Sequence, residues 1–456
     1  MNFIRHTFRD RGDNLRALAL LVALVVFYLS MNAPFFSYMK ENASQLSAFN
    51  PFYGAPFTLN LFNFDPSMYY GNNPSIIHPF LNFLSVPFGD LAQLFPEHLF
   101  FAVVQSVLNA LSAVMMYYYI RNAGSGTFVS LLYAVFFGAA SYSLFSALIP
   151  DSYLYAQFIL ILSVLYLQYS RLEGQTAVGP NASLALANLA VTSTNVAPFM
   201  GALFFNLFLN QKGQKHHWRS RFYRIASGFA VLAAGLTLLQ YVIFGKTWIQ
   251  TWISSLFAGG FSYVAFFSPS EHWKAFYMLI ASPVVTPDVA LIEPSVVAFA
   301  TDLTQPYSPL THVVGVCLAG MALLGFIRHI RSPEGWTLMT FILFGFGLHL
   351  VVGYGLASFR LDLYLYAGHY LFAFFLLGAV WIGSIERPTL RKAAVALVLL
   401  CTLATLGNNI VKHGEVLQTV KAGYASIKGD LEHGANSIRA FEIFRDCAAR
   451  SKHACR

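Results

Sequence analysis

The chain has 456 residues, of which 57% are hydrophobic and only 11% are charged, whereas roughly a quarter of the residues of an ordinary soluble domain are charged. A soluble fold of this length could not cover its surface with so few charges, so the composition predicts a protein embedded in a lipid bilayer. The formal net charge is +8, but the basic residues form short clusters between apolar runs instead of one patch, which argues against a nucleic-acid partner.

The first predicted transmembrane helix lies at about residues 15–31, and the first 16 residues contain four arginines. Basic residues favour the cytoplasmic side of a membrane, so we place the N-terminus in the cytoplasm. The apolar run is long enough to span, and we interpret it as a retained signal-anchor. Residues 32–96 then lie outside, where their Phe, Tyr, Asn and Pro content predicts an ordered lid on the membrane surface.

Eight further single spans follow, separated by short clusters of Lys and Arg on the cytoplasmic side. They are expected at about 98–119, 127–148, 153–169, 225–244, 309–327, 336–355, 364–383 and 393–411.

Residues 181–210 resemble one more span, but the basic segment 212–224 that follows must be cytoplasmic. A single crossing would leave that segment outside. About 30 residues at ~1.5 Å rise per residue can instead form two short helices, and we predict that they turn near 192–195, dipping towards the outer face. Polar backbone at that depth is tolerated where it lines a cavity. The fold class is therefore an all-α polytopic membrane protein with about eleven transmembrane helices and short surface helices in its outer loops.

Two regions follow from this topology, a transmembrane module at 1–411 and an outer-facing, periplasmic tail at 412–456. The second long outer segment, 246–308, contains several prolines and is expected to form short helices on the membrane surface. The tail carries Cys447 and Cys455 in a compartment that we expect to be oxidising, and we predict that they form a disulfide.

The candidate site is in the first outer loop. Residues 63–71 read NFDPSMYYG and residues 78–81 read HPFL, while PDS at 150–152 stands at the outer end of a later span. This pattern resembles GT-C glycosyltransferases, especially protein O-mannosyltransferases and lipid A aminoarabinose transferases. In those enzymes the first outer loop carries an acidic motif, and a His-Pro-Pro-Leu motif opens the next helix.

The match to this family is partial and covers roughly the first 210 residues. Asp65 stands at the acidic position, but the usual Asp-Glu pair is Asp-Pro here, and His78 opens His-Pro-Phe-Leu instead of His-Pro-Pro-Leu. The predicted break around Asn195 is similar to a pair of short helices in the relatives, which often carry a Thr-Lys that this chain lacks. Beyond residue 210 the resemblance rests on topology.

The resemblance implies a GT-C-like bundle and an inverting transferase that moves a sugar from a polyprenyl-phosphate donor to a glycan, lipid or protein acceptor. An acceptor hydroxyl is a poor nucleophile, so a carboxylate must take its proton. Asp65 is the expected base, and Asp151 is expected to position the substrate or to hold a divalent metal together with Asp65. The short loops favour a bacterial inner membrane, with the site on the periplasmic face.

Other residues near the outer surface are candidates for substrate binding, because the leaving lipid phosphate needs a cation or hydrogen-bond donors. They are Tyr69, Tyr70, His78, Asn195, Lys246, Arg360 and His369. Structural roles compete with these assignments. Asp-Pro is a good turn former, Asp151 suits a helix N-cap, and Lys246 suits an interfacial anchor.

Rival functions also remain open. An O-antigen polymerase or ligase would place essential basic residues in the 246–308 loop, which has only Lys246 and Lys274. A transporter or flippase of a lipid-linked sugar predicts charges at mid-membrane and an internal repeat, and little of either is visible. A non-catalytic scaffold would not need acidic residues that converge on one surface.

Overall fold

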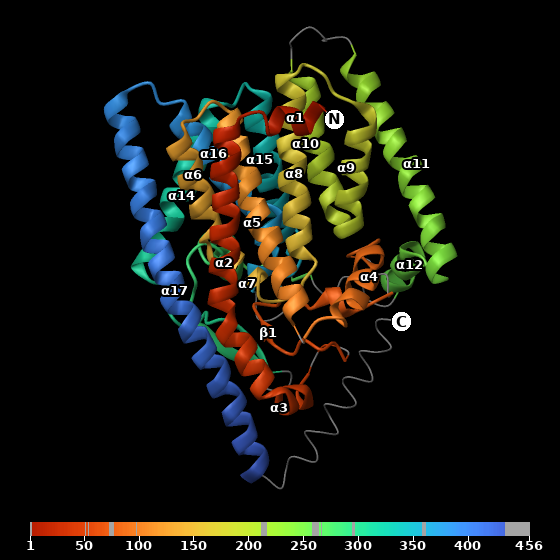
Figure 1. Ribbon diagram of the computed structural model, residues 1–456, viewed down its shortest axis with the longest axis vertical. Helices are drawn as coiled ribbons and strands as arrows, with labels where there is room; N and C mark the ends of the chain where they lie inside the picture. The colour runs from red at the N-terminus through yellow and green to blue at the C-terminus, as the bar shows by residue number, and fades with distance from the viewer. Residues whose placement is uncertain are drawn as a thin grey trace.

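The computed structural model describes residues 2–433, apart from 51, 53, 73–76, 97, 211–216, 258–263, 266, 294–296 and 358–361, and without the side chains of 255–257, 293 and 428–433. Most of the described chain forms helices that run side by side in one bundle (Figure 1). The short helix α1 (Asn2–Thr7) lies at one end of this bundle. The long loops gather at the opposite end, which we call the loop end.

Seven of the described helices are long and apolar enough to cross a bilayer, so the chain is a helical multi-pass membrane protein. They coincide with seven of the predicted spans. They are α2 (Arg11–Glu41), α5 (Leu99–Asn122), α8 (Tyr153–Leu172), α11 (Trp218–Phe244), α14 (Pro309–Arg328), α15 (Pro333–Phe346) with the π-helical turn at Gly347–Val351, and α17 (Pro388–His433).

The remaining predicted spans are built from shorter pieces, so the count of about eleven is not confirmed. They are α6 (Thr127–Gly138) with α7 (Ser141–Ser146), α9 (Val178–Val191) with α10 (Val196–Phe208), and the 3-10 helix η5 (Tyr364–His369) with α16 (Leu371–Gly383). The break after α6 has a tertiary cause. The amides of Ser141 and Tyr142 donate to the carbonyls of Val284 and Pro283 instead of to the preceding turn.

The break predicted near 192–195 is confirmed. The helices α9 and α10 are joined by the 3-10 turn η2 (Ser193–Asn195). This turn is held by the first long loop, because the Ser193 amide donates to the Ile77 carbonyl at 2.8 Å and the Phe80 amide donates to the Ala190 carbonyl at 3.1 Å. The hairpin therefore reaches towards the loop end of the bundle.

The loop end contains the expected short helices and also a small sheet that the all-α prediction missed. The helices are α3 (Ala43–Ala48), η1 (Ser67–Tyr69), α4 (Asn82–Ala92), α12 (Trp248–Phe257) and α13 (Pro269–Ile280). The strands are β1 (Asn60–Leu61), β2 (Val289–Glu293) and β3 (Ala298–Thr301), in the order β1-β3-β2. The two-residue β1 pairs in parallel with β3, which is remote in sequence, and such pairing leaves no local signal in the sequence.

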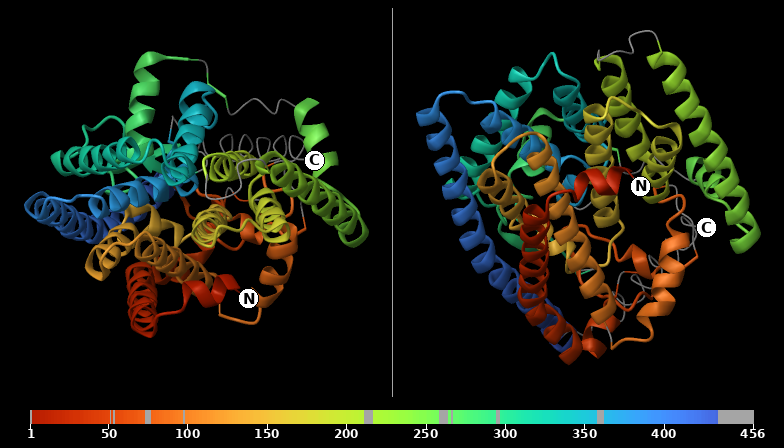
Figure 2. Two further views of the ribbon diagram at one scale, coloured as in Figure 1. Left: turned by 90° about the horizontal axis from the view of Figure 1, so that it is seen from above. Right: turned by 45° about the horizontal axis from the view of Figure 1, so that its top comes forward.

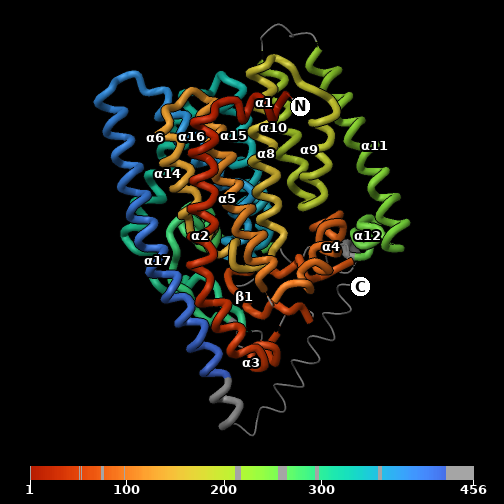
Figure 3. The backbone as a smooth tube through the Cα atoms, viewed as in Figure 1, coloured from red at the N-terminus to blue at the C-terminus, as the bar shows by residue number. Residues whose placement is uncertain are grey.

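Helix α17 continues without a break past the predicted boundary at 411/412. Beyond that boundary it packs on the loop end, where the Tyr424 hydroxyl donates to the Thr58 carbonyl at 3.2 Å and Gln45 Nε2 donates to the Tyr424 carbonyl at 3.1 Å. Figure 3 shows α17 running alongside the segment around α3. Cys447 and Cys455 lie outside the described residues.

Helix α11 lies at the edge of the bundle, as the view from above shows (Figure 2). Only 6% of its most apolar window is buried, and Val231 and Val242 are 71% and 72% exposed. Apolar side chains with this exposure on a helix of spanning length face lipid.

We predict that the N-terminus is cytoplasmic and the C-terminus lies on the other side. Helix α1 and the start of α11 share one end of the bundle, and α17 runs to the loop end (Figure 1). Reporter fusions after residue 456 and within 212–224 should therefore report opposite sides of the membrane. The same side for both fusions would contradict the hairpin topology and invert the second half of the chain.

Candidate active site

The loop that carries Asp65 begins with an unusual backbone turn. Phe62 and Asn63 have φ values of 54° and 60°, a left-handed conformation that Asn tolerates and Phe rarely adopts. Packing holds Phe62 in place, because its ring is stacked on Tyr364 at 4.1 Å between centroids and meets Phe145 edge-on at 4.9 Å. The turn reverses the chain after β1 and directs Asp65 towards the start of α8.

Asp151 anchors this loop to the bundle. Its Oδ2 accepts the backbone N–H of Asp65 at 2.8 Å, and its Oδ1 accepts the backbone N–H of Tyr153 at 3.0 Å. The hydroxyls of Ser67 and Ser152 lie 3.5 and 3.3 Å from the same Oδ1. Asp151 is only 1% exposed. It therefore joins the first long loop to the first turn of α8, which is a positioning role.

Asp65 is half-buried, and only one of its two carboxylate oxygens accepts a hydrogen bond from the described residues. The Tyr70 hydroxyl donates to Asp65 Oδ1, while Oδ2 is not bonded to any residue in the described ranges. Burial raises the pKa of Asp65 from 3.8 to about 6, although the Tyr70 hydrogen bond opposes this shift. Burial, and then the charge of Asp65, raise the pKa of Asp151 to about 8.

His78 contacts Ser152, which follows Asp151, and the end of α9 at the hairpin turn. Its Nδ1 donates to the Val191 carbonyl at 2.6 Å, and the Ser152 hydroxyl is 3.2 Å from the ring nitrogens. Burial lowers the pKa of His78 to about 4, so the imidazole is neutral at pH 7. A neutral ring that donates through Nδ1 presents Nε2 as an acceptor, which suits the Ser152 hydroxyl.

Asn195 and His369 complete the cluster from the hairpin and from η5. His369 Nδ1 is 2.5 Å from Asn195 Oδ1. The Tyr153 ring packs edge-on against His78 at 5.5 Å and against His369 at 5.0 Å, so it lies between the two histidines. Asn195 Nδ2 and His369 Nε2 are buried without a hydrogen-bond partner among the described residues. Such atoms are available to a substrate or to water.

The structure thus brings together six of the residues predicted from the sequence, namely Asp65, Tyr70, His78, Asp151, Asn195 and His369. It adds Ser67, Ser152 and Tyr153, which sequence reasoning missed. Ser152 and Tyr153 follow Asp151 directly, and this adjacency was the signal that could have identified them.

Lys246 does not join the cluster. It is exposed just after α11, and α11 itself meets the His78 loop through Gln240, whose Nε2 donates to the Pro79 carbonyl at 2.7 Å. The interfacial-anchor interpretation of Lys246 therefore fits its position better than donor binding. Arg360 lies outside the described residues.

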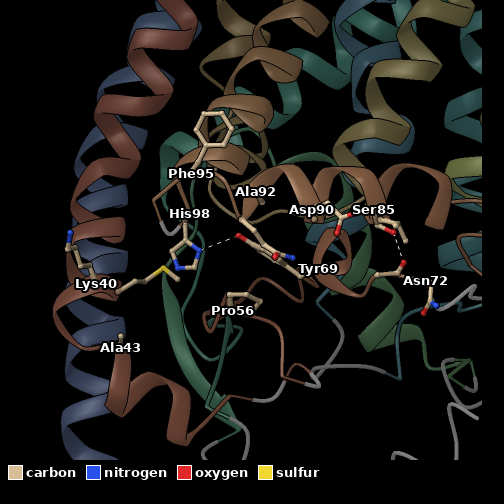
Figure 4. A pocket seen from close by; sticks show the side chains of 15 residues that line it. Lys40, Ala43, Pro56, Tyr69, Asn72, Ser85, Asp90, Ala92, Phe95 and His98 are labelled. Atoms are coloured by element: carbon tan, nitrogen blue, oxygen red, sulfur yellow. Dashed lines mark hydrogen bonds between the residues drawn. The ribbon is translucent and has the colours of Figure 1, made fainter.

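Tyr69 lines a separate cavity of about 740 Å³ (Figure 4). Its hydroxyl is 3.4 Å from His98 Nδ1, and its ring meets Phe101 edge-on at 4.7 Å. Asp65 and Asp151 do not line this cavity. Tyr69 and Tyr70 were predicted together as substrate-binding residues, but Tyr69 lies at this cavity and Tyr70 lies at Asp65.

The donor set does not favour a metal shared by Asp65 and Asp151. Asp151 already accepts a backbone N–H group on each of its two oxygens, so each oxygen keeps only one lone pair for an ion or another donor. In the part of the chain that the structure describes, no group of three or more His, Cys, Asp or Glu side chains is arranged to hold a metal ion.

Comparison with known proteins gives no family assignment. The chain matches no protein-family model, and a search of curated proteins finds no significant match. The assignment of a function therefore rests on the geometry of the cluster and on the motif resemblance around Asp65 and His78.

Proposed function

We propose that this protein is an inverting GT-C-type glycosyltransferase of the membrane, with Asp65 as its general base. The observation that carries the proposal is the state of this carboxylate. Its backbone is held by Asp151, one oxygen is held by Tyr70, and Oδ2 is left open among the described residues. A positioned, partly desolvated carboxylate with one open oxygen suits proton abstraction from an acceptor hydroxyl.

The proposed reaction is a single displacement. Asp65 Oδ2 takes the proton of the acceptor hydroxyl, and the acceptor oxygen forms a bond to the anomeric carbon of the sugar. The bond from that carbon to the donor phosphate breaks on the opposite face, and the polyprenyl phosphate leaves with the electron pair. Asn195 Nδ2 is a buried donor with no partner among the described residues, and it suits an oxygen of the substrate. The polyprenyl chain stays in the bilayer, where burial favours it by ~0.8 kcal/mol per CH₂.

A donor panel tests this proposal. The purified full chain in lipid nanodiscs is incubated with membrane extract as the acceptor source and with undecaprenyl phosphate linked to labelled mannose, glucose or aminoarabinose. Transfer releases undecaprenyl phosphate, which thin-layer chromatography separates from the donor. We expect one donor to be consumed by the wild type and not by Asp65→Asn. Consumption at equal rates by both proteins would refute the role of Asp65.

We also predict that transfer depends on pH through Asp65. The folded-state pKa of about 6 is raised above the ordinary 3.8, so the carboxylate that acts as base is present above pH 6 and is lost as the pH falls through 6. The rate should fall about tenfold per pH unit below that point. Initial rates between pH 4.5 and 8 measure this. A flat profile would contradict the assignment of Asp65 as the base.

A further inference from the structure

Helix α12 has one exposed apolar face. Three and four residues separate the members of this face, a spacing that places side chains on the same side of a helix. The polar side chains of Gln250 and Ser254 are exposed on another side. A helix with two such faces suits the boundary between lipid headgroups and acyl chains, where one face meets water and the other meets lipid. The apolar face consists of Ile249, Trp252 and Ile253, with exposed fractions of 41%, 42% and 48%.

This apolar face follows directly on the lipid-facing surface of α11. Val242 and Ile243 near the end of α11 are exposed, and Gly245 ends that helix in the left-handed conformation. Helix α12 then begins at Trp248, beside the end of α11 (Figure 1). The exposed Lys246 lies between the two helices, and a lysine at the end of a span suits the headgroup level. The continuity with α11 therefore identifies the bilayer surface as the partner of the apolar face.

The start of α12 is attached to the protein on its other side. The indole Nε1 of Trp248 donates to Thr237 Oγ1 at 3.0 Å, and its backbone N–H donates to Gln240 Oε1 at 2.9 Å. These bonds fold the start of α12 back against the last turns of α11. The Trp248 ring also packs edge-on against Phe80 at 6.1 Å between centroids. Phe80 belongs to residues 77–81, which we call the His78 loop.

Gln240 joins α11, α12 and the His78 loop. Its Nε2 donates to the Pro79 carbonyl at 2.7 Å and to Asn82 Oδ1 at 3.1 Å, while its Oε1 accepts the Trp248 amide. Among the side chains of α11, all of which the structure describes, only Ile225 and Gln240 are buried. A buried amide whose donor and acceptor are both used is costly to pull away from its partners. The end of an otherwise lipid-facing helix is thus fastened to the His78 loop through one polar side chain.

We propose that α12 is a membrane-surface anchor for the His78 loop. Its apolar face lies at the boundary between headgroups and acyl chains on the membrane side that holds the loop end. Gln240 and Trp248 fasten the loop to this anchor, so His78 keeps a fixed depth relative to the bilayer surface. The proposal concerns lipid contact and loop order, and it does not depend on glycosyl transfer.

Spin labels on two adjacent residues test the lipid contact. The full chain, with its four cysteines replaced by alanine, carries Ile253→Cys or Ser254→Cys and a nitroxide label, and is placed in phospholipid nanodiscs. Oxygen concentrates in lipid, whereas a nickel chelate stays in water. We expect the label at Ile253 to collide more with oxygen and the matched label at Ser254 to collide more with the chelate. The same preference at both positions would overturn the proposal. Exclusion of both reagents from Ile253 would indicate a protein partner, such as a second copy, and would overturn it as well.

A charge on the apolar face tests the link between the anchor and the loop. Ile253→Glu should lift α12 from the lipid and loosen the His78 loop, and Ser254→Glu is the matched control because its side chain already faces water. The readout is hydrogen exchange at the Phe80 amide, which donates to the Ala190 carbonyl at 3.1 Å. We expect exchange about tenfold faster or more in Ile253→Glu, and a wild-type rate in Ser254→Glu. Equal rates in the two variants would overturn the link.

Gln240→Leu separates the joint from the anchor. Leucine keeps an apolar side chain of similar size but removes the hydrogen bonds to Pro79, Asn82 and Trp248. Exchange at the Phe80 amide should rise, while a label at Ile253 still prefers oxygen, which shows that the variant is folded and inserted. Wild-type exchange in Gln240→Leu would overturn the role of Gln240 as the joint.

Discussion

Asp65→Asn is expected to lower the rate of sugar transfer by roughly 10²–10⁴-fold while donor binding changes little. The substitution keeps the size of the side chain and an oxygen that can accept the Tyr70 hydroxyl. It removes the open carboxylate oxygen that takes the acceptor proton. The loss should therefore appear in kcat, with KM for the donor close to that of the wild type. Single-turnover rates with a labelled undecaprenyl-phosphate sugar separate the two quantities.

A matched aspartate controls for the chemical change itself. Asp302 lies in the loop after β3, and within the described ranges its side chain accepts hydrogen bonds from Thr304 alone. Asp302→Asn should transfer sugar at the wild-type rate. Tyr70→Phe should cause a smaller loss than Asp65→Asn, because it removes a hydrogen bond to the base and leaves the base itself. Near-wild-type transfer by Asp65→Asn would disprove the catalytic assignment.

Asp151→Ala is expected to reduce both stability and turnover. The side chain is buried, and its removal leaves the backbone N–H groups of Asp65 and Tyr153 without their acceptor. Each unsatisfied buried amide costs roughly 1–3 kcal/mol, so the thermal midpoint in detergent should fall by several degrees. The Asp65 loop would also shift, and a displacement near 1 Å can cost about 100-fold in rate.

Asp151→Asn distinguishes this positioning role from metal binding. Asn keeps one acceptor oxygen, so it should restore part of the stability and part of the turnover, and a chelator should leave wild-type turnover unchanged. The pH dependence of stability provides a second readout. Because the folded-state pKa of Asp151 is raised from 3.8 to about 8, its stabilising contribution is full below pH 3.8 and is lost progressively as the pH rises from there through 8. The Asn variant should lack this loss. Loss of wild-type turnover with chelator, restored by added metal, would contradict the positioning role.

The membrane class and the positions of the seven long helices followed from the sequence alone. Both depend on local properties, namely the length of apolar runs and the placement of basic clusters between them. The break at 192–195 was also predictable. The basic segment at 212–224 was expected on the cytoplasmic side, so the stretch before it had to turn back as two short helices. Asp65, His78 and Asp151 were recognisable because charged and ionisable groups are scarce near the loop end.

The assembly of the site was decided only by tertiary structure. The Asp65 amide and the Asp151 carboxylate are 86 residues apart in sequence, and the His369–Asn195 contact joins residues 174 apart. The break after α6 and the pairing of β1 with β3 likewise arise from hydrogen bonds between remote segments. A local pattern of apolar and polar residues carries no record of such partners. For the same reason the sequence grouped Tyr69 with Tyr70, although packing directs one to the separate cavity and the other to Asp65.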